Sequence, residues 1–137
     1  MQREELTETL PRVDQAGVFS LPAHDIPDLV EVAAASGFAV FRVSLARCTD
    51  SSEVLARLGQ QLQFPDWYGQ NWDALSDCLT DFSWREAGGY VLICEQLGDF
   101  RAAGDDDFDT LIEILSDASA SWSVLGIPFW AFLVLEA

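Results

Sequence analysis

The chain has 137 residues, half of them hydrophobic, and its 23 acidic residues outnumber its 7 basic residues, which gives a net charge of −16. This length and apolar content allow one domain with its own hydrophobic core, without a metal or disulfide to stabilise it. Nucleic acid and anionic membranes are poor partners, because they carry charge of the same sign. High net charge also promotes solubility, so charge alone does not identify a partner.

The cysteines and the single histidine form no metal-binding or disulfide pattern. Cys48, Cys78 and Cys94 are odd in number, none belongs to a CxxC pair, and His24 has no further ligand at suitable spacing. We therefore expect no metal, no cofactor and a reducing compartment. The N-terminus lacks the basic start and apolar run of a signal peptide, and no apolar run is long enough to cross a bilayer. These features predict a soluble, cytoplasmic protein.

The start of the chain predicts a strand, a helix and a second strand. Residues 1–12 are polar and are expected to be frayed. Residues 17–22, GVFSLP, alternate weakly and predict a short edge strand. Asp25 is a suitable cap for a helix that ends before Gly37. Residues 38–45 then predict a strand.

Two helices are predicted in the middle of the chain. Asp50 followed by Glu53 is a capping-box pattern, and the apolar residues at helical spacing in 54–62 extend this helix to about Gln63. A second helix is predicted from about residue 71 to residue 82.

The remaining elements complete an α/β pattern. Residues 90–95, YVLICE, predict a buried strand, a helix begins near Asp107, and residues 127–136 predict a strand covered on both faces. Strands separated by helices imply parallel pairing. The predicted fold is α/β, with a small parallel β-sheet of three to four strands packed with about four helices.

The segment FPDWYGQNWDALSDCLTDF, residues 64–82, carries acidic residues at helical spacing. Asp73, Asp77 and Asp81 recur every four residues, and each adjacent pair of like charges on a helix costs roughly 0.2–0.5 kcal/mol. A helical wheel directs these acids away from an apolar face that is expected to join the core. That apolar face comprises Leu75, Cys78, Leu79 and Phe82.

The surroundings of this segment are also acidic and aromatic. Residues 66–117 contain 13 Asp and Glu but only Arg85 and Arg101, a local charge of −11. Trp67 and Tyr68 lie in the loop before the helix, and exposed aromatic rings beside unpaired charge are typical of binding hot spots. A second set of acids follows at four-residue spacing, namely Asp109, Glu113 and Asp117.

The acids of this segment allow two other interpretations. Asp73 and Asp77 lie one helical turn apart, close enough to share a proton or a metal in an enzyme. However, the sequence has no nucleophile paired with a base, no phosphate-binding loop and no metal ligand set, so we expect that the protein is not an enzyme. Each acid could also be an ordinary solvated surface residue.

The segment FPDWYGQNWDALSDCLTDF resembles the loop and second helix of barstar-type ribonuclease inhibitors. The shared features are its Pro, the aromatic pair, Gly-x-Asn, Asp-Ala-Leu and Asp-Cys-Leu. The resemblance extends more loosely over residues 37–137, which implies a barstar-like domain there, with residues 1–36 as an N-terminal extension that adds a strand and a helix to the same domain.

In that family the loop and helix block the active site of a secreted ribonuclease, which protects the cell that produces it. The resemblance therefore implies a cytoplasmic immunity protein that is monomeric alone and binds one basic partner, a ribonuclease, in a one-to-one complex. The partner-binding positions that it implies are Trp67, Gly69, Asn71, Asp73, Ser76, Asp77, Thr80 and Asp117.

Three positions depart from the family pattern. Ser76 replaces a large aromatic residue, Trp67 replaces a tyrosine, and Asp81 and Phe82 replace a Gly-Trp pair. These changes are expected to leave the scaffold intact and to affect the identity of the partner and the affinity for it. The alternative function is therefore a barstar-like acidic module that binds a different basic protein without inhibiting a nuclease.

Overall fold

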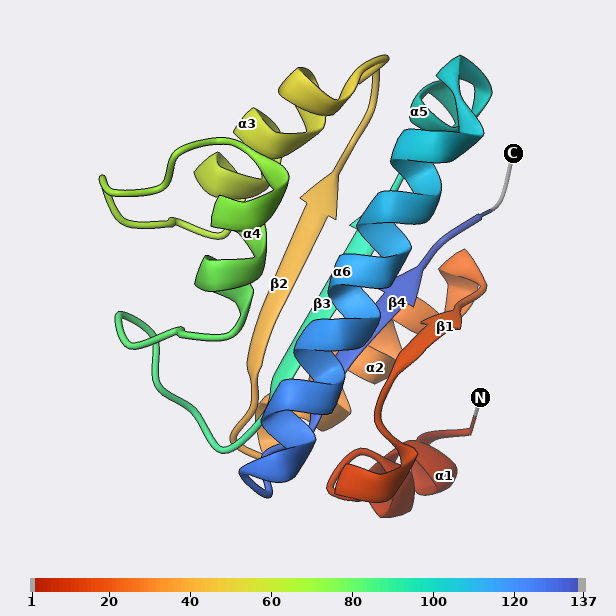
Figure 1. Ribbon diagram of the computed structural model, residues 1–137. Helices are drawn as coiled ribbons and strands as arrows, with labels where there is room; N and C mark the ends of the chain where they lie inside the picture. Colours follow the sequence, from red (N-terminus) through yellow and green to blue (C-terminus); the bar gives the residue numbers. More distant parts are fainter. Residues whose placement is uncertain (1, 136–137) are drawn as a thin grey trace.

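The computed structural model describes residues 2–135 and consists of a parallel sheet between two layers of helices (Figure 1). The strands in these residues run in the order β1-β4-β3-β2, and every neighbouring pair is parallel. This arrangement confirms the predicted α/β fold with a small parallel sheet. The strands are β1 (Val18–Ser20), β2 (Ala39–Ser44), β3 (Tyr90–Glu95) and β4 (Phe129–Leu133).

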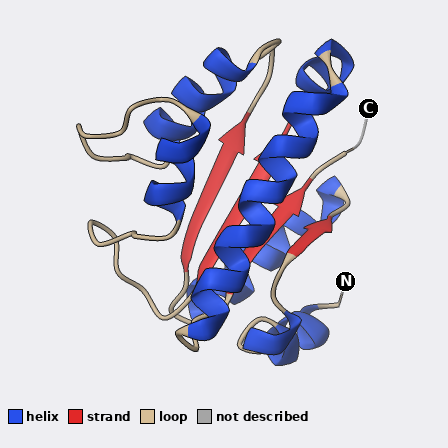
Figure 2. Ribbon diagram, viewed as in Figure 1, coloured by secondary structure: helices blue, strands red, loops and turns tan. Residues whose placement is uncertain are grey.

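Helices cover both faces of the sheet (Figure 2). Helices α1 and α2 pack on one face, and α3, α4, α5 and α6 pack on the other. The bounds of the α-helices in the described residues are α1 (Arg3–Thr9), α2 (Ile26–Ala35), α3 (Ser51–Gln61), α4 (Trp72–Leu79), α5 (Gly98–Ala103) and α6 (Asp105–Val124). None of them is long and apolar enough to span a bilayer.

The central strands contribute to both cores. Tyr90 and Leu92 of β3 pack in the core beneath α3–α6, whereas Val91 and Ile93 pack in the core beneath α1 and α2. All four side chains are buried, as expected for a parallel strand covered on both faces. The same alternation in β4 confirms the predicted double-covered final strand, although Glu136, its last predicted residue, lies outside the described residues.

The expectation of a frayed N-terminus is wrong for the described part of residues 1–12. Helix α1 occupies Arg3–Thr9, and its Leu6 is fully buried with Leu10 at 1% exposure. The Trp130 indole N–H donates a hydrogen bond to the Leu10 carbonyl at 2.9 Å. Two leucines one turn apart are too few to show a helical period in the sequence, yet they suffice to dock α1 on the sheet.

The region around β1 shows how the start of the chain joins the sheet. Val18 lies opposite Ala131 in the parallel register, and Phe19 is 46% exposed, which confirms the predicted short edge strand. Gly37, just after α2, has a φ of +81°, a backbone conformation that favours glycine at a helix end. The assignment of residues 1–36 as an extension stays a prediction.

Helices α3, α5 and α6 also differ from the predicted ones. Helix α5 was not predicted, because it is a single short helix with only Phe100 buried. Helix α6 begins at Asp105, two residues before the predicted start. Helix α3 ends at Gln61 and begins with the predicted cap, in which Asp50 accepts a hydrogen bond from the Glu53 amide at 2.9 Å.

Candidate protein-binding surface

The candidate surface is built on residues 62–71, which connect α3 to α4, together with α4 and the neighbouring part of α6. Asn71 starts α4 as predicted, because its side-chain oxygen accepts a hydrogen bond from the Ala74 amide at 2.7 Å. Such a cap satisfies an amide that has no partner within the helix. The cap fixes the point at which the connecting loop becomes helix.

Tyr68 fastens the connecting loop to α3. Its hydroxyl donates a hydrogen bond to the Leu55 carbonyl at 2.8 Å, and its ring lies edge-on to Phe64 at 4.8 Å between centroids. A Cβ at Gly59 would come within 2.6 Å of the Tyr68 ring, so this contact depends on glycine there. Burial raises the pKa of Tyr68, which keeps its hydroxyl protonated as the donor.

Trp67 points outward from the same loop and is 55% exposed. Its indole meets that of Trp84 edge-on, with 6.2 Å between ring centroids. Trp84 was not among the residues predicted from the sequence. It follows α4 by five residues in a segment without regular structure, so no periodicity could place it beneath the loop.

Helix α4 presents two different faces. Leu75, Cys78 and Leu79 are buried, which confirms the predicted core face. Asp73 and Asp77 are exposed on the outer face, and Ser76 is partly buried between the two. Burial, followed by the nearby carboxylates of Asp77 and Asp81, raises the pKa of the Cys78 thiol to about 11.

The predicted helix of residues 71–82 is too long at its C-terminal end, because α4 stops at Leu79. The Thr80 hydroxyl donates to the Ser76 carbonyl at 2.9 Å, and Phe82 adopts a left-handed conformation with φ 48°. Asp81 therefore lies beyond the helix. The acidic ridge on α4 consists of Asp73 and Asp77 alone.

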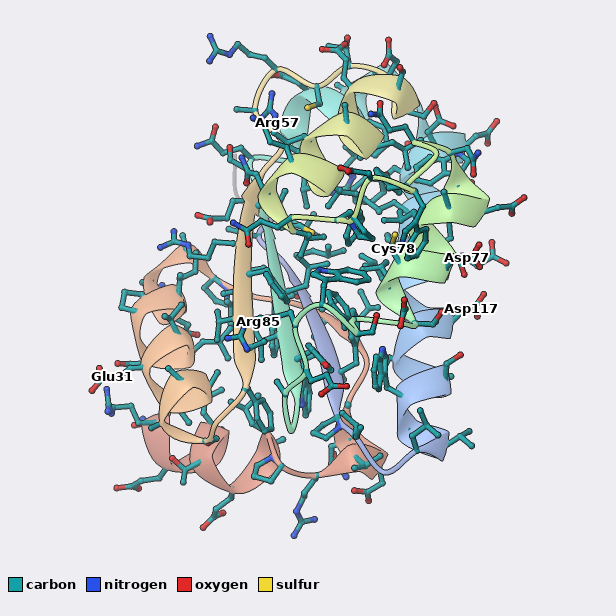
Figure 3. The ribbon with its side chains drawn as sticks, turned by 90° about the vertical axis from the view of Figure 1, so that its left-hand side faces the viewer. Glu31, Arg57, Asp77, Cys78, Arg85 and Asp117 are labelled. Atoms are coloured by element: carbon teal, nitrogen blue, oxygen red, sulfur yellow. The ribbon has the colours of Figure 1, made fainter. Side chains whose placement is uncertain are left out.

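A buried hydrogen bond joins the end of α4 to α6. The Trp122 indole N–H donates to the Leu79 carbonyl at 2.7 Å. The two helices lie on the same side of the sheet, and Asp77 and Asp117 project from them on the same side of the molecule (Figure 3). Figure 3 also places Glu31 on the opposite side.

The acids of this surface are not neutralised within the protein. In residues 2–135, Asp73, Asp77 and Asp117 form no ion pair. The arginine ion pairs lie elsewhere, between Arg3 and the acids Asp28 and Glu31 and between Arg42 and Glu95. Exposed carboxylates without internal partners remain free to accept charge-assisted hydrogen bonds from another molecule.

The predicted site residues thus fall on three neighbouring elements. The connecting loop carries Trp67, Gly69 and Asn71; α4 carries Asp73, Ser76 and Asp77, with Thr80 at its end; and α6 carries Asp117. Their role in binding stays a prediction. Among the described residues, no group of three or more His, Cys, Asp or Glu side chains is placed to hold a metal ion.

Comparison with known proteins identifies the family. A search of curated proteins found no match. The model of the family described as Barstar (barnase inhibitor) matches residues 38–134, which is more than half of the chain and runs from β2 through β4 with the connecting loop and α4 included. The chain therefore belongs to the barstar family.

Proposed function

We propose that this protein inhibits a ribonuclease by covering the active site of the enzyme with residues 64–82. One observation carries the proposal: exposed carboxylates on α4 and α6 have no partner within residues 2–135, and the anchored loop that leads into α4 carries an exposed tryptophan. Membership of the barstar family supports the same interpretation. The proposed contacts are Trp67, Gly69, Asn71, Asp73, Ser76, Asp77, Thr80 and Asp117.

The chemistry of a ribonuclease explains why carboxylates suit this role. A ribonuclease binds phosphate groups with Lys, Arg and His side chains, so Asp73 and Asp77 can occupy phosphate positions and accept charge-assisted hydrogen bonds. The net charge of −16 attracts such a basic enzyme before contact. Fast encounter is valuable to an inhibitor, because the nuclease must be blocked before it cleaves RNA.

We further propose a one-to-one complex formed in the cytoplasm, with the free inhibitor as a monomer. One loop and one helix insert into one active site, which fixes this stoichiometry. In this arrangement the inhibitor protects the cell that makes the nuclease.

Titration of purified basic ribonucleases with the protein tests the proposal. RNA cleavage should fall to the background level near an equimolar ratio, and Asp77→Asn should require more protein than the wild type. Asp14→Asn, which removes the same charge from the turn at Val13–Gln15, is the matched control and should inhibit like the wild type. RNA hydrolysis by the pure protein itself, lost in Asp77→Asn, would overturn the proposal.

The alternative, binding to a basic protein without nuclease inhibition, is favoured by Ser76. This residue offers a small hydroxyl where the family pattern has a large aromatic ring, which reduces the apolar contact available to a nuclease. The alternative would be established by a partner captured from cell extract that has no ribonuclease activity and whose binding is weakened by Asp77→Asn.

A further inference from the structure

A column of aromatic rings leads from the core to the proposed binding surface; we call Tyr90, Phe82, Trp84 and Trp67 the aromatic column. Phe82 stacks on Tyr90 with 4.6 Å between centroids and an interplanar angle of 17°. Trp84 packs on Phe82 at 5.4 Å, and Trp67 meets Trp84 at 6.2 Å with an angle of 80°. Tyr90 and Phe82 are buried, so the column is anchored at its inner end.

Trp84 is the support of Trp67 within this column. In residues 2–135, the only ring contact of Trp67 is with Trp84, although Trp67 is the most exposed aromatic residue among the large hydrophobic side chains at the surface. Trp84 itself is held on a second side by Phe64, edge-on at 5.8 Å. The orientation of the exposed indole therefore depends on a neighbour that the core holds in place.

The indole of Trp84 carries one polar group that the interior does not satisfy. Its Nε1 is buried and has no hydrogen-bond partner in the described residues. A buried donor without an acceptor loses its hydration and destabilises the folded state. Phenylalanine would provide an aromatic ring without this cost, but it is smaller than the indole that contacts Phe64, Phe82 and Trp67. Of these three neighbours only Trp67 is exposed, so the larger indole extends the buried packing to the surface ring.

We propose that Trp84 is a positioning residue, which holds Trp67 in the orientation used to contact the partner. This inference rests on the proposed function, in which Trp67 is a contact residue. A side chain that is already oriented loses less conformational freedom when the complex forms, so affinity rises without any contact between Trp84 and the partner. Trp84 thereby acts on binding through Trp67.

Circular dichroism of the free protein tests the fixed orientation without a partner. Two indoles held at a fixed angle and short distance give a coupled pair of bands, and Trp67→Phe and Trp84→Phe should each abolish it. Trp72→Phe, which removes an indole outside the aromatic column, is the matched control and should retain the bands. Absence of the coupled bands from the wild type would overturn the proposal.

A double-mutant cycle with the inhibited ribonuclease tests the effect on binding. Trp84→Ala should weaken binding about 3- to 10-fold, the value expected for one aromatic pair. Trp84→Phe should recover part of this loss. In a Trp67→Ala background, Trp84→Ala should cause no further loss, because it acts through the missing ring. Leu10→Ala, which opens the core on the other face of the sheet, controls for general destabilisation and should not weaken binding.

The outcomes separate this inference from the proposed function. Additive losses in the cycle, or wild-type affinity in Trp84→Ala, would overturn the positioning role while nuclease inhibition by the wild type stands. If the wild type inhibits no ribonuclease, the proposed function fails, and the dichroism comparison alone decides whether Trp84 orients Trp67.

Discussion

Asp77→Ala should increase stability and weaken binding. Asp77 lies in the last turn of α4, where a negative charge opposes the negative end of the helix dipole, and Asp73 lies one turn earlier. Its carboxylate forms no ion pair in the described residues, and the hydrogen bond from the Thr80 hydroxyl goes to the main-chain carbonyl of Asp77, at 3.3 Å, and not to its side chain. The substitution therefore removes two repulsions and breaks no ion pair or side-chain hydrogen bond within residues 2–135.

The stability gain is the sum of three small effects. Alanine is the better helix former by up to ~0.7 kcal/mol, and relief of the dipole and of the Asp73 repulsion each adds a few tenths. Together they predict about 0.5–1.5 kcal/mol, which raises the unfolding temperature by about 2–6 °C for a chain of this size.

Binding should change in the opposite direction by a larger amount. Removing one carboxylate from a desolvated charge pair costs roughly 2–5 kcal/mol, about 30- to 5000-fold in affinity, because the cations of the partner lose their acceptor. Chemical denaturation and titration of the same preparations measure both quantities. Asp14→Ala has the same net charge as Asp77→Ala, so a comparison of the two variants separates the loss of one local charge pair from the change in the overall electrostatic field.

Two results would refute this reasoning. Lower stability of Asp77→Ala would show that the carboxylate has a structural role in α4. Unchanged affinity for an identified partner would show that the exposed acids of α4 do not take part in recognition.

Three further outcomes are expected. Association should slow as salt rises, because the Debye length falls from about 8 Å at physiological ionic strength to about 3 Å at 1 M; a constant association rate would exclude steering. Deleting residues 1–15 should lower the unfolding midpoint, because it removes Leu6 and Leu10, which are 0% and 1% exposed. The folded fraction of this deletion variant should bind the partner like the wild type. Stability should fall above pH 9, because burial raises the pKa of Cys78 from 9.0 to about 11 and that of Cys94 from 9.0 to about 12, so both thiols release a proton on unfolding. Cys78→Ala should make this decline less steep, and an equally steep decline in the variant would contradict the prediction.

The features that could be predicted from the sequence are local and periodic. The 3.6-residue spacing of Leu75, Cys78 and Leu79 gave the buried face of α4, and Asn71 gave its start, because a cap acts on the next turn. The alternation of strands with helices was enough to predict a parallel sheet. These inferences need no information from distant parts of the chain.

The features that could not be predicted depend on distant or short contacts. The C-terminal end of α4 was missed because Phe82 adopts a left-handed conformation that normally indicates glycine or asparagine. Trp84 was missed because its neighbours come from the loop before α4 as well as from Phe82. The hydrogen bond that joins α4 to α6 links Leu79 to Trp122, and no local pattern predicts a pair so far apart.

If the proposed surface binds the partner, the anchoring of α4 means that exposed side chains, rather than movement of the helix, determine which partner is bound. Tyr68 fixes the loop before the helix through the Leu55 carbonyl, and Trp122 fixes the helix end through the Leu79 carbonyl. Because both attachments exist in the free protein, little conformational freedom is left to lose on binding. The Thr80 hydroxyl donates to the main-chain carbonyl of Ser76, and the Ser76 hydroxyl forms no hydrogen bond within residues 2–135. A substitution at Ser76 should therefore alter affinity and partner choice while the supporting structure is kept.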